Sequence, residues 1–214
     1  MKLFIVRHGE TDWNVEGRFQ GRLDTELSEL GRRQGEKAAE YLSGHTFEAV
    51  VSGPLKRTLE TGGLIAAACG CETLEVMDEL AEICHGDWEG LLSDDVQRRW
   101  PGLVALWHEL PHTVVMPGAG GESLRSVQIR ALTAVECIRK KYPGDVCVVT
   151  HDAVIKALLC HFLNASLSAY WRCQIANCSL TIAELRDGVP PRVSLMGDAH
   201  YLGIGFELPE QKGM

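Results

Sequence analysis

Four basic side chains stand where apolar segments of the sequence end. They are Arg7, His8, Arg57 and His151. Arginine forks match phosphate oxygens in bidentate geometry, and a neutral imidazole is a nucleophile in covalent catalysis. If the fold brings the four side chains together, they predict a site that binds a phosphate group and acts on it.

The apolar segments have the length and composition of buried strands, and they alternate with helical patterns. We expect strands at 2–6, 47–52, 145–150, 178–185 and 192–196, and helices at 27–42, 54–68, 123–142 and 154–163. This alternation is typical of an α/β fold with a largely parallel sheet. Ligands bind such sheets beyond the carboxyl ends of the strands, so residues that follow separate strands converge there.

The composition argues against several other classes of protein. The 214 residues carry a formal net charge of −8, which disfavours a nucleic acid as the main partner. The N-terminal apolar run is too short for a signal peptide, and no run is long enough to span a membrane. The eight cysteines match no zinc pattern, so we interpret them as reduced thiols. We expect a cytoplasmic protein that binds a small phosphorylated substrate at a local basic site.

Longer motifs around these residues resemble the histidine phosphatase superfamily, in its phosphoglycerate mutase-like branch. The motifs occur in the family's order: RHGETDWN (7–14), RFQG (18–21), SGPLKRTLET (52–61), ELAEICHGDWEG (79–90), GGES (120–123) and VVTHDAVIKALL (148–159). The resemblance implies a single domain over 1–214, built as a three-layer α/β/α sandwich with a mostly parallel central sheet. It also implies a small cap insertion at about 84–120.

The resemblance assigns roles residue by residue. His8 matches the histidine that becomes phosphorylated, and Arg7, Arg57 and His151 match the rest of the phosphate-binding core. Glu82 matches the carboxylate that acts as proton donor. Three further positions match residues that line the phosphate and substrate pocket: Asn14, Gln20 and Gly21.

Elementary electrostatics supports these roles. Two arginines and a second histidine close to His8 disfavour its imidazolium form, so its pKa falls and the nucleophile stays neutral. Glu82 must hold a proton if it is to protonate the leaving alkoxide, so we expect burial or a nearby phosphate to raise its pKa. The scheme requires neither a metal nor a cofactor, because positive charge and positioning carry phosphoryl transfer.

Two candidate pocket residues depart from the family's pattern. His85 stands where the family usually has an aromatic or aliphatic residue, and it either faces the leaving group or forms part of the pocket wall without a chemical role. Asp152 stands where the family usually has glycine. A carboxylate beside a bound phosphate is repulsive unless it points away, so we expect Asp152 to cap the helix that begins there.

Hydrolysis of small phosphomonoesters, with release of inorganic phosphate, is the expected function. The phosphoglycerate mutases of this branch carry a longer insertion, and a tyrosine and basic residues after the catalytic glutamate, which this sequence lacks after Glu82. A cofactor-dependent mutase remains an alternative, as does a non-catalytic module that binds a phosphorylated ligand, although such a module would be expected to lack His8 or Glu82. Among substrates we favour α-ribazole 5′-phosphate or a broad range, because the cap's tryptophans could cover a hydrophobic leaving group.

Overall fold

One six-stranded sheet organises the molecule. The structure is a computed structural model that describes residues 1–203, and residues 204–214 of the expected domain lie outside this range. The strands are β1 (Lys2–Arg7), β2 (Ala49–Ser52), β3 (Leu74–Val76), β4 (Val146–Thr150), β5 (Leu180–Arg186) and β6 (Val189–Asp198), in the order β3-β2-β4-β1-β5-β6. The pairs β3/β2, β2/β4 and β4/β1 are parallel, whereas β1/β5 and β5/β6 are antiparallel. The expected α/β class with a mostly parallel sheet is confirmed.

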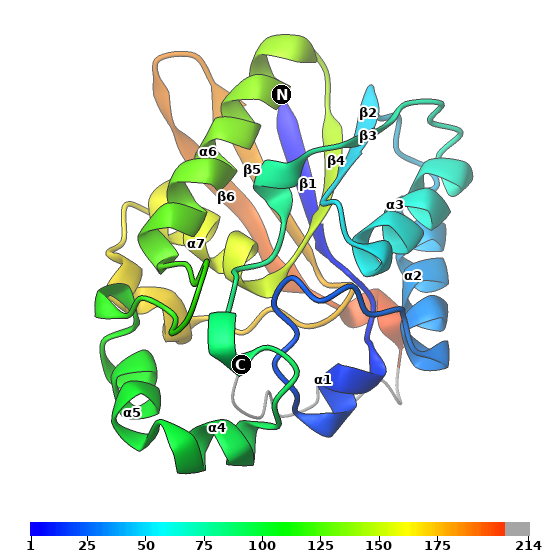
Figure 1. Ribbon diagram of the computed structural model, residues 1–214. Helices are drawn as coiled ribbons and strands as arrows, with labels where there is room; N and C mark the ends of the chain where they lie inside the picture. The colour runs from blue at the N-terminus through cyan, green and yellow to red at the C-terminus, as the bar shows by residue number, and fades with distance from the viewer. Residues whose placement is uncertain (204–214) are drawn as a thin grey trace.

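Helices cover both faces of the sheet, as Figure 1 shows. One layer holds α2 (Glu29–Leu42) and α3 (Lys56–Ala68), and the other holds α6 (Leu124–Lys141) and α7 (Asp152–Phe162). Three shorter helices lie beyond the end of β1: α1 (Asp12–Glu16), α4 (Ser93–Arg99) and α5 (Pro101–Glu109). Short 3-10 helices occur at Asp78–Leu80, Gly86–Trp88, Pro111–Thr113, Leu167–Arg172 and His200–Leu202. The layers are therefore those of the expected three-layer sandwich.

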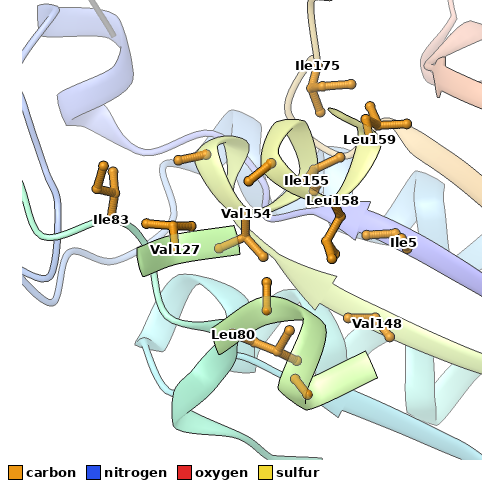
Figure 2. Close-up of a cluster of buried hydrophobic side chains, with 14 of the residues drawn as sticks. Ile5, Leu80, Ile83, Val127, Val148, Val154, Ile155, Leu158, Leu159 and Ile175 are labelled. Carbon is orange, nitrogen blue, oxygen red and sulfur yellow. The ribbon is translucent and has the colours of Figure 1, made fainter. Parts of the chain in front are cut away.

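The central strand β1 is apolar on both sides because each side faces a helical layer. Leu3 and Ile5 belong to the core cluster that includes α6 and α7, whereas Phe4 and Val6 belong to the cluster with α2 and α3. In Figure 2, Ile5 lies among side chains of the first cluster. Successive side chains of a strand point to opposite faces, so a strand buried on both faces requires an uninterrupted apolar run.

Local hydrogen bonds mark where two helices begin. Ser28 caps α2 as expected, because its Oγ accepts a hydrogen bond from the Gly31 N–H at 3.0 Å. The expected start of α3 at Pro54 is wrong: the helix begins at Lys56, after Leu55 as the N-cap. The Thr58 hydroxyl donates to the Leu55 carbonyl at 2.7 Å, and the Thr58 N–H donates to the same carbonyl, so helical hydrogen bonding starts one residue after the proline.

Two glycines allow the loop after β1 to cross the start of α2. A Cβ on Gly31 would overlap the carbonyl of Glu10, and a Cβ on Gly9 would overlap the carbonyl of Gly31. The crossing is fixed by Ser28, whose N–H donates to the Glu10 carbonyl at 2.9 Å and whose hydroxyl donates to the Glu10 carboxylate at 2.9 Å. Because His8 directly precedes this loop, the crossing fixes the backbone on the C-terminal side of the histidine.

A pair of glycine substitutions tests this crossing. We expect Gly31→Ala to lower the free energy of unfolding by about 1–3 kcal/mol, because backbone atoms of another element occupy the space of the new methyl group. Gly63→Ala is the matched control in helix α3, where nothing lies within 4 Å of an added Cβ. This control should gain about 0.4–1 kcal/mol, because alanine restricts the unfolded chain. Urea unfolding measures both, and a Gly31→Ala protein as stable as the wild type would contradict the crossing.

Candidate active site

The four basic residues meet at the carboxyl ends of three parallel strands. Arg7 is the last residue of β1, His8 follows it, Arg57 lies in the first turn of α3 after β2, and His151 directly follows β4. All four side chains are buried. The His8 N–H donates to the Thr150 carbonyl at 3.0 Å, and the rings of His8 and His151 lie 5.1 Å apart between centroids. The structure thus brings together the residues that the sequence separates by up to 144 positions, from Arg7 to His151.

His8 presents one ring nitrogen to the site. Its Nδ1 lies 2.7 Å from the Gly9 carbonyl oxygen, and because a carbonyl only accepts, Nδ1 carries the proton and donates. Nε2 is then the nitrogen with the free lone pair. Burial first, and then the charges of Arg57 and Arg7, hold the pKa of His8 well below its ordinary value. The imidazole is therefore neutral at neutral pH, as expected from the sequence.

His151 is the second neutral imidazole of the site. Its side chain is fully buried, and neither ring nitrogen has a hydrogen-bond partner within the part of the chain that the structure describes. Burial, followed by the charge of Arg57, holds the pKa of His151 well below its ordinary value. A neutral imidazole carries one N–H, and an oxyanion bound next to the two arginines would accept a hydrogen bond from it.

Backbone carbonyls hold the Arg57 guanidinium. Nη2 donates to the Gly21 carbonyl at 2.8 Å, and Nη1 donates to the Leu23 carbonyl at 2.9 Å, whereas Nε has no hydrogen-bond partner among residues 1–203. Burial lowers the pKa of Arg57 to about 10, so the group remains charged at neutral pH. The loop that contains Gly21 therefore orients this cation.

Glu82 lies on the segment that follows the turn at Asp78–Leu80. One carboxylate oxygen accepts a hydrogen bond from the Ile83 N–H at 2.9 Å. Burial, followed by the negative charge of Asp152, raises the pKa of Glu82, against the opposing effect of Arg57 and Arg7. A carboxyl group with a raised pKa beside a phosphate site is suited to proton donation.

Arg130 on α6 supports the Glu82 segment, a function that sequence reasoning missed. Its guanidinium donates to the Ala81 carbonyl at 2.6 Å and to the Glu82 carbonyl at 3.1 Å, and it pairs with Glu122 at 2.9 Å. Glu122 belongs to the GGES motif, so the only sequence signal was an unexplained carboxylate next to a helix start. Ala81 and Glu82 lie 49 and 48 residues from Arg130 in the chain, so local sequence patterns do not reveal these contacts.

The three outer-pocket candidates make contacts of different kinds. The Asn14 side chain accepts a hydrogen bond from the Thr11 N–H at 3.0 Å and belongs to the capping box of α1. Gln20 accepts a hydrogen bond from the Thr25 hydroxyl at 2.6 Å. Gly21 contacts the phosphate-binding residues directly, because its carbonyl accepts a hydrogen bond from Arg57. Its φ of 52° lies in the left-handed region, which favours glycine.

His85 lies in an aromatic cluster of the expected cap. Its ring is 5.0 Å from the ring of Phe19, 6.4 Å from that of Trp88 and 6.3 Å from that of Trp107, measured between centroids. Burial lowers the pKa of His85 to about 4, so this imidazole is neutral. Its Nδ1 has no hydrogen-bond partner in the described range. This packing is that of a residue in the pocket wall, and it leaves Nδ1 without a hydrogen bond in that range.

The expected capping role of Asp152 is wrong. The N-cap of α7 is His151, without a side-chain capping bond, and Asp152 is the first residue of the helix. The Asp152 Oδ2 lies 2.8 Å from the Lys156 Nζ, and Oδ1 lies 3.7 Å from the Arg7 Nη1. The fully buried ammonium of Lys156 needs a counter-ion, and the carboxylate one turn earlier supplies it. Asp152 therefore points toward the phosphate site and not away from it.

The model of the histidine phosphatase superfamily (branch 1) matches residues 3–198. The chain belongs to the histidine phosphatase superfamily. Phosphoserine phosphatase 1 of Hydrogenobacter thermophilus is 38% identical over 188 residues, which cover 87% of this chain and 88% of the relative.

Two further members of the superfamily are similar over most of their length. A metal-independent phosphoserine phosphatase of Arabidopsis thaliana is 34% identical over 96% of this chain and 85% of its own. The structure of mycobacterial glucosyl-3-phosphoglycerate phosphatase superimposes with a TM-score of 0.81 at 31% identity, covering 92% of this chain and 98% of that one. All three of these relatives are named as phosphatases, and the shared architecture confirms the phosphoglycerate mutase-like fold.

Within residues 1–203, no three or more His, Cys, Asp or Glu side chains are grouped so that they could hold a metal ion. None of the helices described is both long and apolar enough to cross a membrane. All eight cysteines have free thiols. The basic group around His8 is therefore the feature on which a functional proposal can be built.

Proposed function

We propose that this protein is a phosphatase that hydrolyses small phosphomonoesters through a phosphohistidine intermediate on His8. The observation that carries the proposal is the pair of neutral imidazoles, 5.1 Å apart, between two buried guanidinium groups. Membership of the superfamily and its named phosphatases support the same reaction. In this assignment Arg7, Arg57 and His151 bind the phosphate oxygens.

In the first step, the Nε2 of His8 attacks phosphorus, forming a P–N bond while the ester P–O bond breaks. The leaving alkoxide takes a proton from the Glu82 carboxyl group, whose raised pKa keeps that proton available. The hydrogen bond from Nδ1 to the Gly9 carbonyl fixes the tautomer and the direction of attack. Charge on the equatorial oxygens is stabilised by groups that are oriented before the substrate arrives.

In the second step, water attacks phosphorus and the P–N bond breaks. Glu82, now a carboxylate, accepts the proton of that water, and inorganic phosphate leaves with His8 restored to its neutral form. Both steps use the same residues with proton transfer reversed, so neither needs a metal or a cofactor. The presence of both His8 and Glu82 supports this cycle over a non-catalytic binding module, and the sequence after Glu82 supports hydrolysis over a mutase reaction.

We rank O-phosphoserine ahead of α-ribazole 5′-phosphate, the ester favoured from the sequence. That earlier preference depended on tryptophans of the cap covering a hydrophobic leaving group. Trp88 is fully buried and Trp107 is 1% exposed, so the faces of both are packed and not open to a ligand, whereas Trp100 of the cap is partly exposed. Two relatives are named phosphoserine phosphatases, and the mycobacterial relative is named for glucosyl-3-phosphoglycerate, which carries a carboxylate as phosphoserine does.

The contacts of Arg22 favour a substrate that carries a carboxylate in addition to its phosphate ester. It follows Gly21, the residue that holds Arg57, and its N–H donates to the Glu89 carboxylate at 3.1 Å. Its guanidinium is 46% exposed and lies 3.2 Å from Glu122. The same oxygen of Glu122 already accepts from the Cys84 N–H at 2.9 Å and from an arginine of α6. Arg22 is therefore the less tightly held cation, and we assign it to the substrate carboxylate.

Replacing the proposed proton donor tests the mechanism. We expect Glu82→Gln to lower kcat/KM for O-phosphoserine by about 10²-fold to 10⁴-fold, because the serine alkoxide leaves poorly without a proton. The loss for p-nitrophenyl phosphate should be much smaller, since p-nitrophenolate is a stable leaving group. Wild-type kcat/KM should also fall as pH rises through the raised pKa of Glu82, where the acid form is lost.

Glu72→Gln, an exposed carboxylate at the end of a loop, is the matched control and should leave both rates unchanged. Equal losses for the two esters in Glu82→Gln would contradict the role of Glu82 as the acid.

A substrate panel tests the assignment of the leaving group. With EDTA present, we compare O-phosphoserine, phosphoethanolamine, α-ribazole 5′-phosphate, sugar phosphates and 3-phosphoglycerate. Phosphoethanolamine is phosphoserine without its carboxylate. Arg22→Met should lower kcat/KM for phosphoserine on the order of tenfold, and leave phosphoethanolamine unchanged, because only phosphoserine offers a carboxylate to Arg22.

Arg33→Met, which removes an exposed arginine from α2, controls for loss of surface charge. Losses of the same size for both esters in Arg22→Met would refute the carboxylate assignment. Phosphate release that requires added metal would refute the hydrolytic scheme, and isomerisation of 3-phosphoglycerate without phosphate release would indicate a mutase.

A further inference from the structure

A row of buried charges leads from helix α7 to the phosphate site. Lys156 is fully buried, and its Nζ lies 2.8 Å from the Asp152 Oδ2. The other carboxylate oxygen of Asp152 lies 3.7 Å from the Arg7 Nη1. The order is therefore cation, anion, cation, and the last cation is one of the two arginines of the site. None of these contacts is needed to cap the helix.

The lysine end of the row is fixed by aromatic rings. The Lys156 Nζ lies 5.1 Å from the ring centroid of Tyr170 and 4.8 Å from that of Trp171. Both rings come from the segment after α7, and Tyr170 is itself buried. A desolvated ammonium above two aromatic rings gains electrostatic stabilisation beyond its ion pair. The carboxylate of Asp152 is thus held from the side away from Arg7.

Arg7 is restrained at one end of its guanidinium. Its Nη1 donates to the Ile175 carbonyl at 2.6 Å and faces the Asp152 Oδ1. Its Nε is buried and has no hydrogen-bond partner in the described part of the chain. The protein therefore fixes the Nη1 end and leaves Nε to donate to a bound group.

We propose that Asp152, held by Lys156, is a positioning residue that orients the Arg7 guanidinium for the substrate's phosphate. The proposal rests on the phosphatase function proposed above. A carboxylate close to a phosphate costs affinity through repulsion, so its presence requires a compensating gain. Orientation of Arg7 supplies that gain, because a bidentate arginine contact depends on the angle of the fork. The same charge raises the pKa of Glu82, which favours the acid form needed in the first step.

Two variants separate orientation from stability. Asp152→Asn keeps the shape of the side chain but removes the ion pair between Asp152 and the buried Lys156, which destabilises the fold. The double variant Asp152→Asn/Lys156→Met removes both charges, so its thermal unfolding temperature should return close to that of the wild type. In both variants we expect Ki for inorganic phosphate and KM for O-phosphoserine to rise together, on the order of tenfold. We expect kcat to change much less at a pH low enough to keep Glu82 protonated, since loss of the Asp152 charge also lowers the pKa of this acid.

Glu29→Gln is the matched control, since it breaks an exposed ion pair with Arg33 at the same helical spacing. It should leave Ki and KM unchanged. A double variant that is as stable as the wild type and binds phosphate equally well or more tightly would overturn the proposal. So would a loss confined to kcat. If the wild-type protein hydrolyses no phosphomonoester, the proposed function itself is refuted, and this outcome is distinct from any difference between the variants.

Discussion

The burial of like charges at one end of the sheet is the constraint on which the rest of the site depends. Two guanidinium groups and two imidazoles occupy one buried region, where each positive charge opposes the next. The two histidines respond by losing their protons, because burial and the arginines hold both pKa values well below the ordinary value. The arginines stay charged, and backbone carbonyls of Gly21, Leu23 and Ile175 satisfy part of each guanidinium. A bound oxyanion would balance the remaining positive charge of the two arginines.

The scaffold maintains this arrangement through contacts that lie outside the reacting groups. Parallel strands buried on both faces end at the same edge and bring their following residues together. The glycine crossing fixes the loop after His8. Arg130 on α6 holds the Glu82 segment by a hydrogen bond to the Glu82 carbonyl. Glu82 is therefore positioned by a helical layer, whereas His8 is positioned by the end of β1. Movement of any of these elements would alter the distance between His8 and Glu82, which no local contact between the two residues sets.

The sequence predicted the parts of the fold that follow from short-range patterns. The strands β1, β2 and β4 and the helices α2, α6 and α7 were anticipated within a few residues, because apolar periodicity and serine caps are local signals. Strand β3 was missed, since it has only three residues and two of them are exposed. The short helices α1, α4 and α5 were also not anticipated, because none has a long periodic pattern.

The candidate site was anticipated for its central residues and less well for its surroundings. The convergence of Arg7, His8, Arg57 and His151 followed from their repeated position after strands. Asp152 was expected to point away from the phosphate, but it points toward Arg7. Its ion pair with Lys156, inside the expected helix at 154–163, was not anticipated. Arg130 and Arg22 have partners whose proximity depends on the tertiary fold. The burial of Trp88 and Trp107 in the cap likewise depends on tertiary packing.

Trapping the intermediate tests the central claim most directly. The protein is mixed rapidly with O-phosphoserine, quenched in alkali and digested with trypsin for mass spectrometry. Peptides 8–18 and 142–156 each contain a single histidine, His8 and His151 respectively. We predict phosphate on peptide 8–18, lost on treatment with acid and absent from a His8→Ala protein, while His112→Ala, which removes an exposed histidine, is labelled like the wild type. Phosphate on peptide 142–156, or label that survives acid, would contradict the assignment of His8 as the nucleophile.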